Sequence, residues 1–156
     1  MFSWKSAATA AAVLAGAVSV SAESHTINFV NNCGTGTPVL SQNFNTISNG
    51  PSYTANGPFS AAIAYLDTGC GFQGDNCAIV ELTLINGGVS SVDVSLIPNH
   101  AFNVKTGFTY FNGCDGTGAT CASADCPTTD AFHVTDDYEA QRQCTSDDVG
   151  VTITFC

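Results

Sequence analysis

Glu81 and Asp93 are the two acidic residues whose spacing says most about chemistry. They flank Asn86-Gly87-Gly88, a turn sequence with the three-residue length of a common hairpin loop. A hairpin closed by this turn pairs Glu81 directly with Asp93, and it places Thr83 opposite Ser91 on the same face. Two carboxylates facing each other across a strand pair repel, so a sequence that keeps them there is a candidate for using them.

Paired carboxylates suit three kinds of chemistry, and the pair alone does not separate them. Glycoside hydrolysis needs one carboxyl as acid, for which Glu81 is the candidate, and a second as nucleophile or base, here Asp93. The same pair can accept hydrogen bonds from sugar hydroxyls, or it can bind a cation. A solvated polar sheet face is the alternative that involves no site. A serine nucleophile has no support, because no G-x-S-x-G sequence occurs, and we interpret His100 and His133 as surface residues.

The eight cysteines all lie after residue 32. An even cysteine count in an exported chain predicts four disulfides. Zinc is disfavoured because no two cysteines form a C-x-x-C pair and the three histidines have no i,i+4 spacing. We therefore expect no metal and no other cofactor. A bridge from Cys33 to Cys156 would hold the first strand beside the last one, a hypothesis from position alone.

The first 22 residues have the order of a signal peptide. Lys5 precedes an uncharged run over residues 6–20, and small residues follow up to Ala22. The run is shorter than the roughly 20 apolar residues that a membrane-spanning helix needs. We expect cleavage near Ala22 and a single domain over residues 23–156. The protein should then be secreted, and it could be associated with a cell wall.

The predicted mature chain is strongly acidic. Its only cations are Lys105 and Arg142 against thirteen acidic residues, a formal net charge of −11. Such a charge repels phosphate backbones and anionic lipids, so neither nucleic acid nor a membrane is an expected partner. Hydrophobic residues make up 44% of the chain and charged residues 10%, which indicates a packed domain rather than disorder. We expect a monomer.

Strand patterns dominate the mature chain. Alternation of apolar and polar residues predicts strands at residues 25–30, 79–85, 92–97, 101–111 and 149–155. Clusters of Asn, Gly and Pro separate them, and only residues 136–143 suggest a helical turn. Many short strands with frequent turns predict an all-β protein, either an antiparallel β-sandwich or a flattened barrel.

Five segments of the chain resemble the thaumatin-like protein family. In chain order they are residues 25–33 (HTINFVNNC, the opening strand), 92–104 (its D-(I/V)-S-x-(I/V) and F-N-V region), 113–121 (G-C-x-G-x-x-C), 126–132 (C-P-D-A-F with two inserted threonines) and 151–156 (the closing V-T-F-C). The resemblance implies a disulfide-stapled β-domain of thaumatin-like type. Only residues 122–125 stand where full-length members carry a cysteine-rich second domain. The chain therefore resembles the short, single-domain, fungal type.

The resemblance also implies a disulfide pairing that uses each cysteine once. The implied bridges are Cys33–Cys156, Cys70–Cys77, Cys114–Cys144 and Cys121–Cys126. The last of these would close the gap left by the missing second domain.

Thaumatin-like proteins carry an acidic cleft of one Arg, one Glu and three Asp, which is associated with antifungal activity and with β-1,3-glucan binding or weak hydrolysis. The resemblance assigns Glu81 to the Glu, Asp93 to the first Asp and Asp130 to the third. Gly107 stands where the second Asp would be, and the Arg position falls near Asn45.

Two further residues join these ligand-binding candidates. Strand parity from Gly107 adds Lys105 and Phe111 to the groove side. The cleft of full-length members lies between two domains, so its far wall should be absent here. A shallow groove excludes water poorly, which weakens a catalytic interpretation.

These observations predict a secreted protein that binds cell-wall carbohydrate of the β-1,3-glucan class, with a defence or antifungal role. One alternative is a non-enzymatic structural, inhibitor or effector protein that docks on a protein partner. A second alternative is a weak endo-β-1,3-glucanase that uses Glu81 as the acid and Asp93 as its partner.

Overall fold

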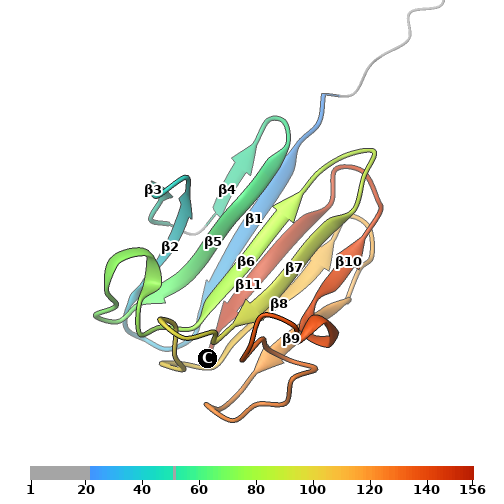
Figure 1. Ribbon diagram of the computed structural model, residues 1–156. Helices are drawn as coiled ribbons and strands as arrows, with labels where there is room; N and C mark the ends of the chain where they lie inside the picture. Colours follow the sequence, from blue (N-terminus) through green and yellow to red (C-terminus); the bar gives the residue numbers. More distant parts are fainter. Residues whose placement is uncertain (1–21, 51) are drawn as a thin grey trace, which may run out of the picture.

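The computed structural model describes residues 22–50 and 52–156, so residues 1–21 of the predicted leader lie outside the described part. Strands predominate in the described chain, and two short 3-10 helices accompany them (Figure 1). The elements are β1 (His25–Asn31), β2 (Thr37–Gln42), β3 (Asn45–Ser48), β4 (Ser52–Ala55), β5 (Phe59–Asp67), η1 (Phe72–Gly74), β6 (Ile79–Leu84), β7 (Ser90–Ser95), β8 (Thr106–Phe111), β9 (Gly118–Cys121), η2 (Tyr138–Ala140), β10 (Arg142–Cys144) and β11 (Gly150–Phe155).

The strands form two sheets. The five-stranded sheet has the order β4-β1-β11-β8-β9, and the six-stranded sheet has the order β10-β7-β6-β5-β2-β3. The terminal strands β1 and β11 are parallel neighbours, whereas the other pairs are antiparallel. Figure 1 looks onto the six-stranded sheet, with the five-stranded sheet behind it.

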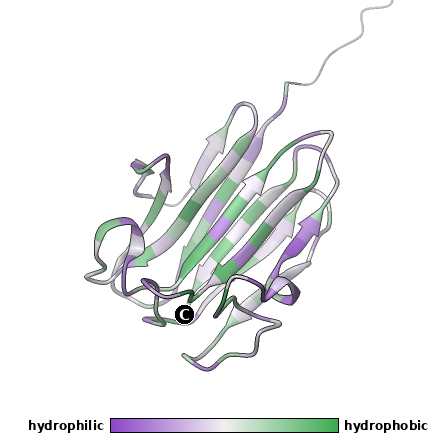
Figure 2. Cartoon of the chain, viewed as in Figure 1, coloured by the Kyte–Doolittle hydropathy of each residue, from purple (hydrophilic) through white to green (hydrophobic). Residues whose placement is uncertain are grey.

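One hydrophobic core lies between the two sheets. Ile27 and Val151 pair in register on the five-stranded sheet, and Val80 and Val94 pair on the six-stranded sheet, all of them fully buried. Each such aliphatic side chain contributes roughly 1.5–3 kcal/mol when removed from water. Apolar and polar residues alternate along the strands (Figure 2), because successive side chains of a strand point to opposite faces. The architecture is therefore the predicted all-β sandwich.

The structure shows the four disulfides that the resemblance implied. They join Cys33 to Cys156, Cys70 to Cys77, Cys114 to Cys144 and Cys121 to Cys126. The first of them links the ends of the parallel strands β1 and β11. Within the described ranges no helix has the length and apolar character needed to cross a membrane.

The predicted strand over residues 101–111 is wrong at its start. Strand β8 begins only at Thr106, and residues 101–105 form a loop. Asn103 fixes that loop, because its side chain accepts a hydrogen bond from the Ala78 amide and donates to the Leu66 carbonyl and the Thr68 hydroxyl. The other four predicted strands are present with small shifts at their ends, and the expected helical turn is η2.

Candidate functional site

The outer face of the six-stranded sheet carries a groove. Its first hollow, with a volume of about 480 Å³, lies over β2, β5 and β6, and its second, of about 400 Å³, lies over β5, β6 and β7. Ala61, Ile63 and Glu81 line both hollows, so the two hollows form one continuous groove across the sheet. We call this the sheet groove.

A β-bulge shapes the middle of the sheet groove. The register of β5 against β6 shifts between Phe59 and Ala62, and Ala61 adopts a positive φ of 52°. The Ala61 amide, which has left the ladder, donates instead to the Thr83 hydroxyl at 3.1 Å. Bulges bend a strand and redirect side chains, and here the small Ala61 keeps the centre of the groove open.

Glu81 and Asp93 form the floor of the groove. They pair directly across β6 and β7, as the sequence predicted. Glu81 is exposed, whereas Asp93 is only 6% exposed, and its Oδ2 atom has no hydrogen-bond partner among the described residues. A buried polar atom without a partner is uncommon in a folded protein and calls for a functional explanation.

The pKa of Asp93 reflects this environment. This pKa is raised from 3.8 to about 7, mainly because burial disfavours the charged form and also because the Glu81 carboxylate is close by, while Gln141 lowers it. The negative charge of Glu81 thus favours the protonated form of Asp93, because like charges disfavour ionisation of both carboxyl groups.

Two exposed phenyl rings form one wall of the groove. Phe44 and Phe72 are 77% and 69% exposed, and their rings stack with centroids 6.4 Å apart and an interplanar angle of 10°. Asn43 and Phe44 form the two-residue turn between β2 and β3, both with positive φ. Positive φ is rare for a bulky residue such as Phe44, and strained residues of this kind gather at functional sites.

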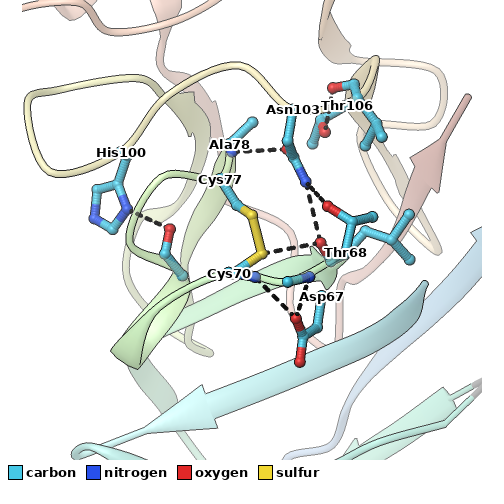
Figure 3. Close-up of a disulfide and its surroundings, with 12 residues drawn as sticks. Asp67, Thr68, Cys70, Cys77, Ala78, His100, Asn103 and Thr106 are labelled. Atoms are coloured by element: carbon cyan, nitrogen blue, oxygen red, sulfur yellow. Dashed lines mark hydrogen bonds between the residues drawn. A yellow bond between two sulfur atoms is a disulfide. The ribbon is translucent and has the colours of Figure 1, made fainter.

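The Cys70–Cys77 disulfide positions Phe72. It closes a short loop that contains η1, and Asp67 accepts hydrogen bonds from the Cys70 and Gly69 amides at the base of the loop (Figure 3). His100 contacts the carbonyl of Gly74 in this loop at 3.0 Å through its Nδ1 atom (Figure 3). The loop is therefore held at both ends, and this keeps the Phe72 ring in place over the sheet.

The opposite end of the groove is built by the segment before β10. Phe132 pairs with the end of β7, since its amide donates to the Val94 carbonyl and its carbonyl accepts from the Leu96 amide. The exposed ring of Tyr138 in η2 packs edge-on against Phe132 at 6.1 Å between centroids. This segment and the β2–β3 hairpin lie at opposite edges of the six-stranded sheet (Figure 1).

Arg142 holds this segment together. Its guanidinium donates hydrogen bonds to the backbone carbonyls of Gly118, Thr129 and Glu139. It is therefore used for structure and does not replace the arginine that the family's cleft carries.

The structure does not bring all of the predicted ligand-binding residues together. Lys105 directly precedes β8 and Phe111 ends it, and β8 belongs to the five-stranded sheet, away from the sheet groove. On β8 the side chains of Phe108 and Tyr110 fill the core, so Phe111 points to the other outer face and covers Gly150. Placing Lys105 and Phe111 on the groove side was therefore wrong.

Asp130 lies outside the two hollows, and both predicted surface histidines are half-buried. Asp130 lies two residues before Phe132, close in sequence to the groove wall, but its side chain lines neither hollow. His100 and His133 are half-buried rather than on the surface, and each ring contacts a backbone carbonyl, that of Cys126 in the case of His133. His100 lines the first hollow.

Among the described residues, no group of three or more His, Cys, Asp or Glu side chains could hold a metal ion.

Sequence reasoning missed the aromatic residues of the groove. Phe44 lies in a turn, and Phe72 and Tyr138 lie in short 3-10 helices, so no strand alternation marks them. The one available signal was the presence of large aromatic rings in otherwise polar turn sequences such as Asn43-Phe44-Asn45.

Comparisons with known proteins identify the fold. The structure is similar to that of the thaumatin-like xylanase inhibitor TLXI, with a TM-score of 0.55, 18% sequence identity, and coverage of 85% of this chain and 98% of that one. It is also similar to the protein elicitor MoHrip2 from Magnaporthe oryzae, with a TM-score of 0.50, 13% identity, and coverage of 86% and 99%. No protein-family model and no curated protein sequence matches the chain. The chain thus has the fold of thaumatin-like proteins.

Proposed function

We propose that the protein is a secreted thaumatin-like protein of the short, single-domain, fungal type, which binds a cell-wall polysaccharide of the β-1,3-glucan class in the sheet groove. Its role would be in defence or at the cell wall, outside the cell. The extent of the two structural matches, which cover 98% and 99% of those chains, supports the single-domain assignment.

The observation that carries the proposal is the combination of exposed rings with an unpartnered carboxyl oxygen. Phe44 and Phe72 offer flat apolar faces at one end of the groove, and Tyr138 offers another at the far end. Sugar rings have apolar faces that pack on aromatic rings, and their hydroxyls can donate to carboxyl oxygens such as Asp93 Oδ2. Ligand sites commonly combine apolar walls with a few placed polar groups in this way.

Binding to insoluble β-1,3-glucan tests the proposal. We expect the protein to sediment with the particles, and we expect the double variant Phe44→Ala/Phe72→Ala to remain largely in solution. Val89→Ala, which shortens an exposed apolar side chain outside the groove, is the matched control and should sediment like the wild type. A wild-type protein that stays wholly in solution would overturn the proposal.

A second candidate function is docking on another protein, without catalysis. It is favoured by the exposed Phe44–Phe72 stack, since aromatic residues are enriched at the centres of interfaces. The similarity to a protein described as a xylanase inhibitor suggests xylanases as the first partners to test. Inhibition of a xylanase that is lost in Phe44→Ala/Phe72→Ala would favour this function over glucan binding.

The glucanase alternative gains no support from the geometry. Retaining glycosidases keep their two carboxyls about 5–5.5 Å apart and inverting ones about 6.5–9.5 Å apart, with room for a sugar atom or a water. The groove over Glu81 and Asp93 is open to solvent, so it lacks the closed, water-excluding site in which two carboxyls could work at either separation. Our proposal is therefore binding rather than hydrolysis.

A further inference from the structure

The charges that line the sheet groove are of one sign. Asp75, Glu81 and Asp93 are its acidic residues, and the described lining residues include no Lys or Arg. Both cations of the predicted mature chain are placed elsewhere. Lys105 lies beside the five-stranded sheet, and Arg142 donates to three backbone carbonyls. The field inside the groove is therefore negative and uncompensated.

One carboxyl oxygen of Asp93 lacks a hydrogen-bond donor among the described residues. Its Oδ2 atom is buried without a hydrogen-bond partner, and the residue lines the second hollow next to Glu81. A hydroxyl can supply one neutral hydrogen bond there. An ammonium group supplies three donors together with a positive charge, which compensates both carboxyls, and charge-assisted hydrogen bonds are about twice as strong as neutral ones.

The aromatic residues restrict which cation fits. The Phe44–Phe72 stack lies at the β2 edge of the groove, and Tyr138 precedes β10. The stack lines the first hollow, over β2, β5 and β6, whereas Tyr138 lines the second, which reaches β7. A ligand that reaches both ends must therefore be a chain of rings running across the strands, rather than a single sugar.

We propose that the groove selects a polysaccharide with free amino groups, of which a polymer of glucosamine is the simplest example. One ammonium group binds between Glu81 and Asp93, and neighbouring sugar rings pack on Phe72 and Tyr138. The inference rests on the proposed function, because it takes the sheet groove as the polysaccharide site. It goes further by naming a cationic sugar as the preferred ligand over neutral β-1,3-glucan.

Three hexamers of similar size test the selection by calorimetric titration. These are the glucosamine hexamer, its fully N-acetylated counterpart and laminarihexaose, the β-1,3-linked glucose hexamer. We expect the glucosamine hexamer to bind about tenfold more tightly than either neutral hexamer. Added salt should weaken only the binding of the charged hexamer, because it screens the attraction.

Charge-matched variants test whether the preference depends on the carboxylates of the groove or on the overall negative charge of the protein. Glu81→Gln removes one exposed carboxylate, so the variant should fold, and it should lose most of the tenfold preference. Asp93→Asn should act in the same direction. Glu139→Gln and Asp125→Asn remove the same charges at exposed positions that line neither hollow, and they should keep the preference.

The possible outcomes distinguish this inference from the proposed function. Equal binding of the three hexamers overturns the amino-sugar selection and leaves polysaccharide binding standing. Binding of none of them overturns both proposals. Hexalysine that binds as tightly as the glucosamine hexamer, with all four variants weakened alike, would show only unspecific attraction of a polycation and would also overturn the selection.

Discussion

Glu81 and Asp93 face each other across the β6–β7 pair at the floor of the sheet groove, where the Glu81 carboxylate helps to raise the pKa of Asp93. One partner is exposed and the other is buried, with an oxygen atom that no described group satisfies. The arrangement costs stability in the absence of a ligand, since a buried polar group without a partner is unfavourable. A ligand that donates to Asp93 would remove this cost on binding.

The first prediction concerns the pH dependence of stability. Because the pKa of Asp93 rises from 3.8 to about 7 on folding, the folded protein binds more protons than the unfolded chain between about pH 4 and pH 7. The contribution of Asp93 to the free energy of unfolding therefore falls as the pH rises through this window, by up to about 4 kcal/mol at 1.36 kcal/mol per pKa unit. Asp93→Asn stays neutral and should remove this fall.

Urea unfolding of the wild type and Asp93→Asn across this range measures the effect. The variant should be more stable than the wild type near pH 8 and similar to it near pH 4. Asp125→Asn, at an exposed position, serves as the control and should follow the wild type. Parallel profiles for the wild type and Asp93→Asn would contradict the assigned environment of Asp93.

The second prediction separates two disulfides by their roles. The Cys33–Cys156 bridge has a sequence separation of 123 and the Cys70–Cys77 bridge one of 7. In the chain-entropy model they stabilise the fold by about 5 and about 2 kcal/mol, respectively. Replacing both cysteines of a pair by serine should thus lower the melting temperature much more for the first pair than for the second.

Glucan binding should instead depend more on the Cys70–Cys77 bridge than on the Cys33–Cys156 bridge. The Cys70–Cys77 bridge holds the loop that carries Phe72, so its removal should weaken glucan binding even where the protein remains folded. Sedimentation with β-1,3-glucan at a temperature well below both melting points measures this. Unchanged binding by the Cys70→Ser/Cys77→Ser variant would argue against a role for the Phe72 wall.

The third prediction concerns Gly107, which the family resemblance assigns to the position of the cleft's second Asp. A Cβ atom at this position would clash with the Thr120 hydroxyl and lie 2.9 Å from the Ala119 carbonyl oxygen. Gly107→Asp should therefore destabilise the protein by about 1–3 kcal/mol, as overpacking does, and it should not strengthen glucan binding. Calorimetric unfolding and the sedimentation assay test the two halves of this prediction. A stable variant with tighter binding would show that the glycine is not structurally required.

The fourth prediction addresses catalysis. Because the groove over Glu81 and Asp93 is open to water, we expect no release of reducing sugar from laminarin above that of a buffer blank. Glu81→Gln should give the same reading as the wild type. Release by the wild type that Glu81→Gln abolishes would restore the glucanase alternative.

Much of the fold was predictable because strand periodicity and turn residues are local signals. The Asn86-Gly87-Gly88 turn predicted the Glu81–Asp93 register, and the structure has that register. The family resemblance supplied the disulfide pairing, which spacing alone leaves open. Strand β5, the longest of the described strands, was missed, because its run FSAAIAYLD is interrupted by the bulge that exposes Ala61.

Of the candidate site, only the Glu81–Asp93 pair could be predicted from the sequence. Lys105 and Phe111 were placed on the groove side by parity within one strand, but that strand belongs to the other sheet, a relationship that is set by long-range pairing of β8 with β11. The rings of Phe44 and Phe72 meet through contacts between two turns that lie far apart in the chain. No local pattern in the sequence encodes such a contact.

The central claim is that the outer face of the six-stranded sheet binds a polysaccharide, and backbone amide chemical shifts recorded during titration with laminarihexaose test it most directly. We predict shifts at Ala61, Ile63 and Glu81, which line both hollows, together with Phe72 and Tyr138 at the two ends. The amides of β1, β11 and β8 in the opposite sheet should stay unchanged. Shifts confined to that five-stranded sheet, or none at saturating ligand, would contradict the account.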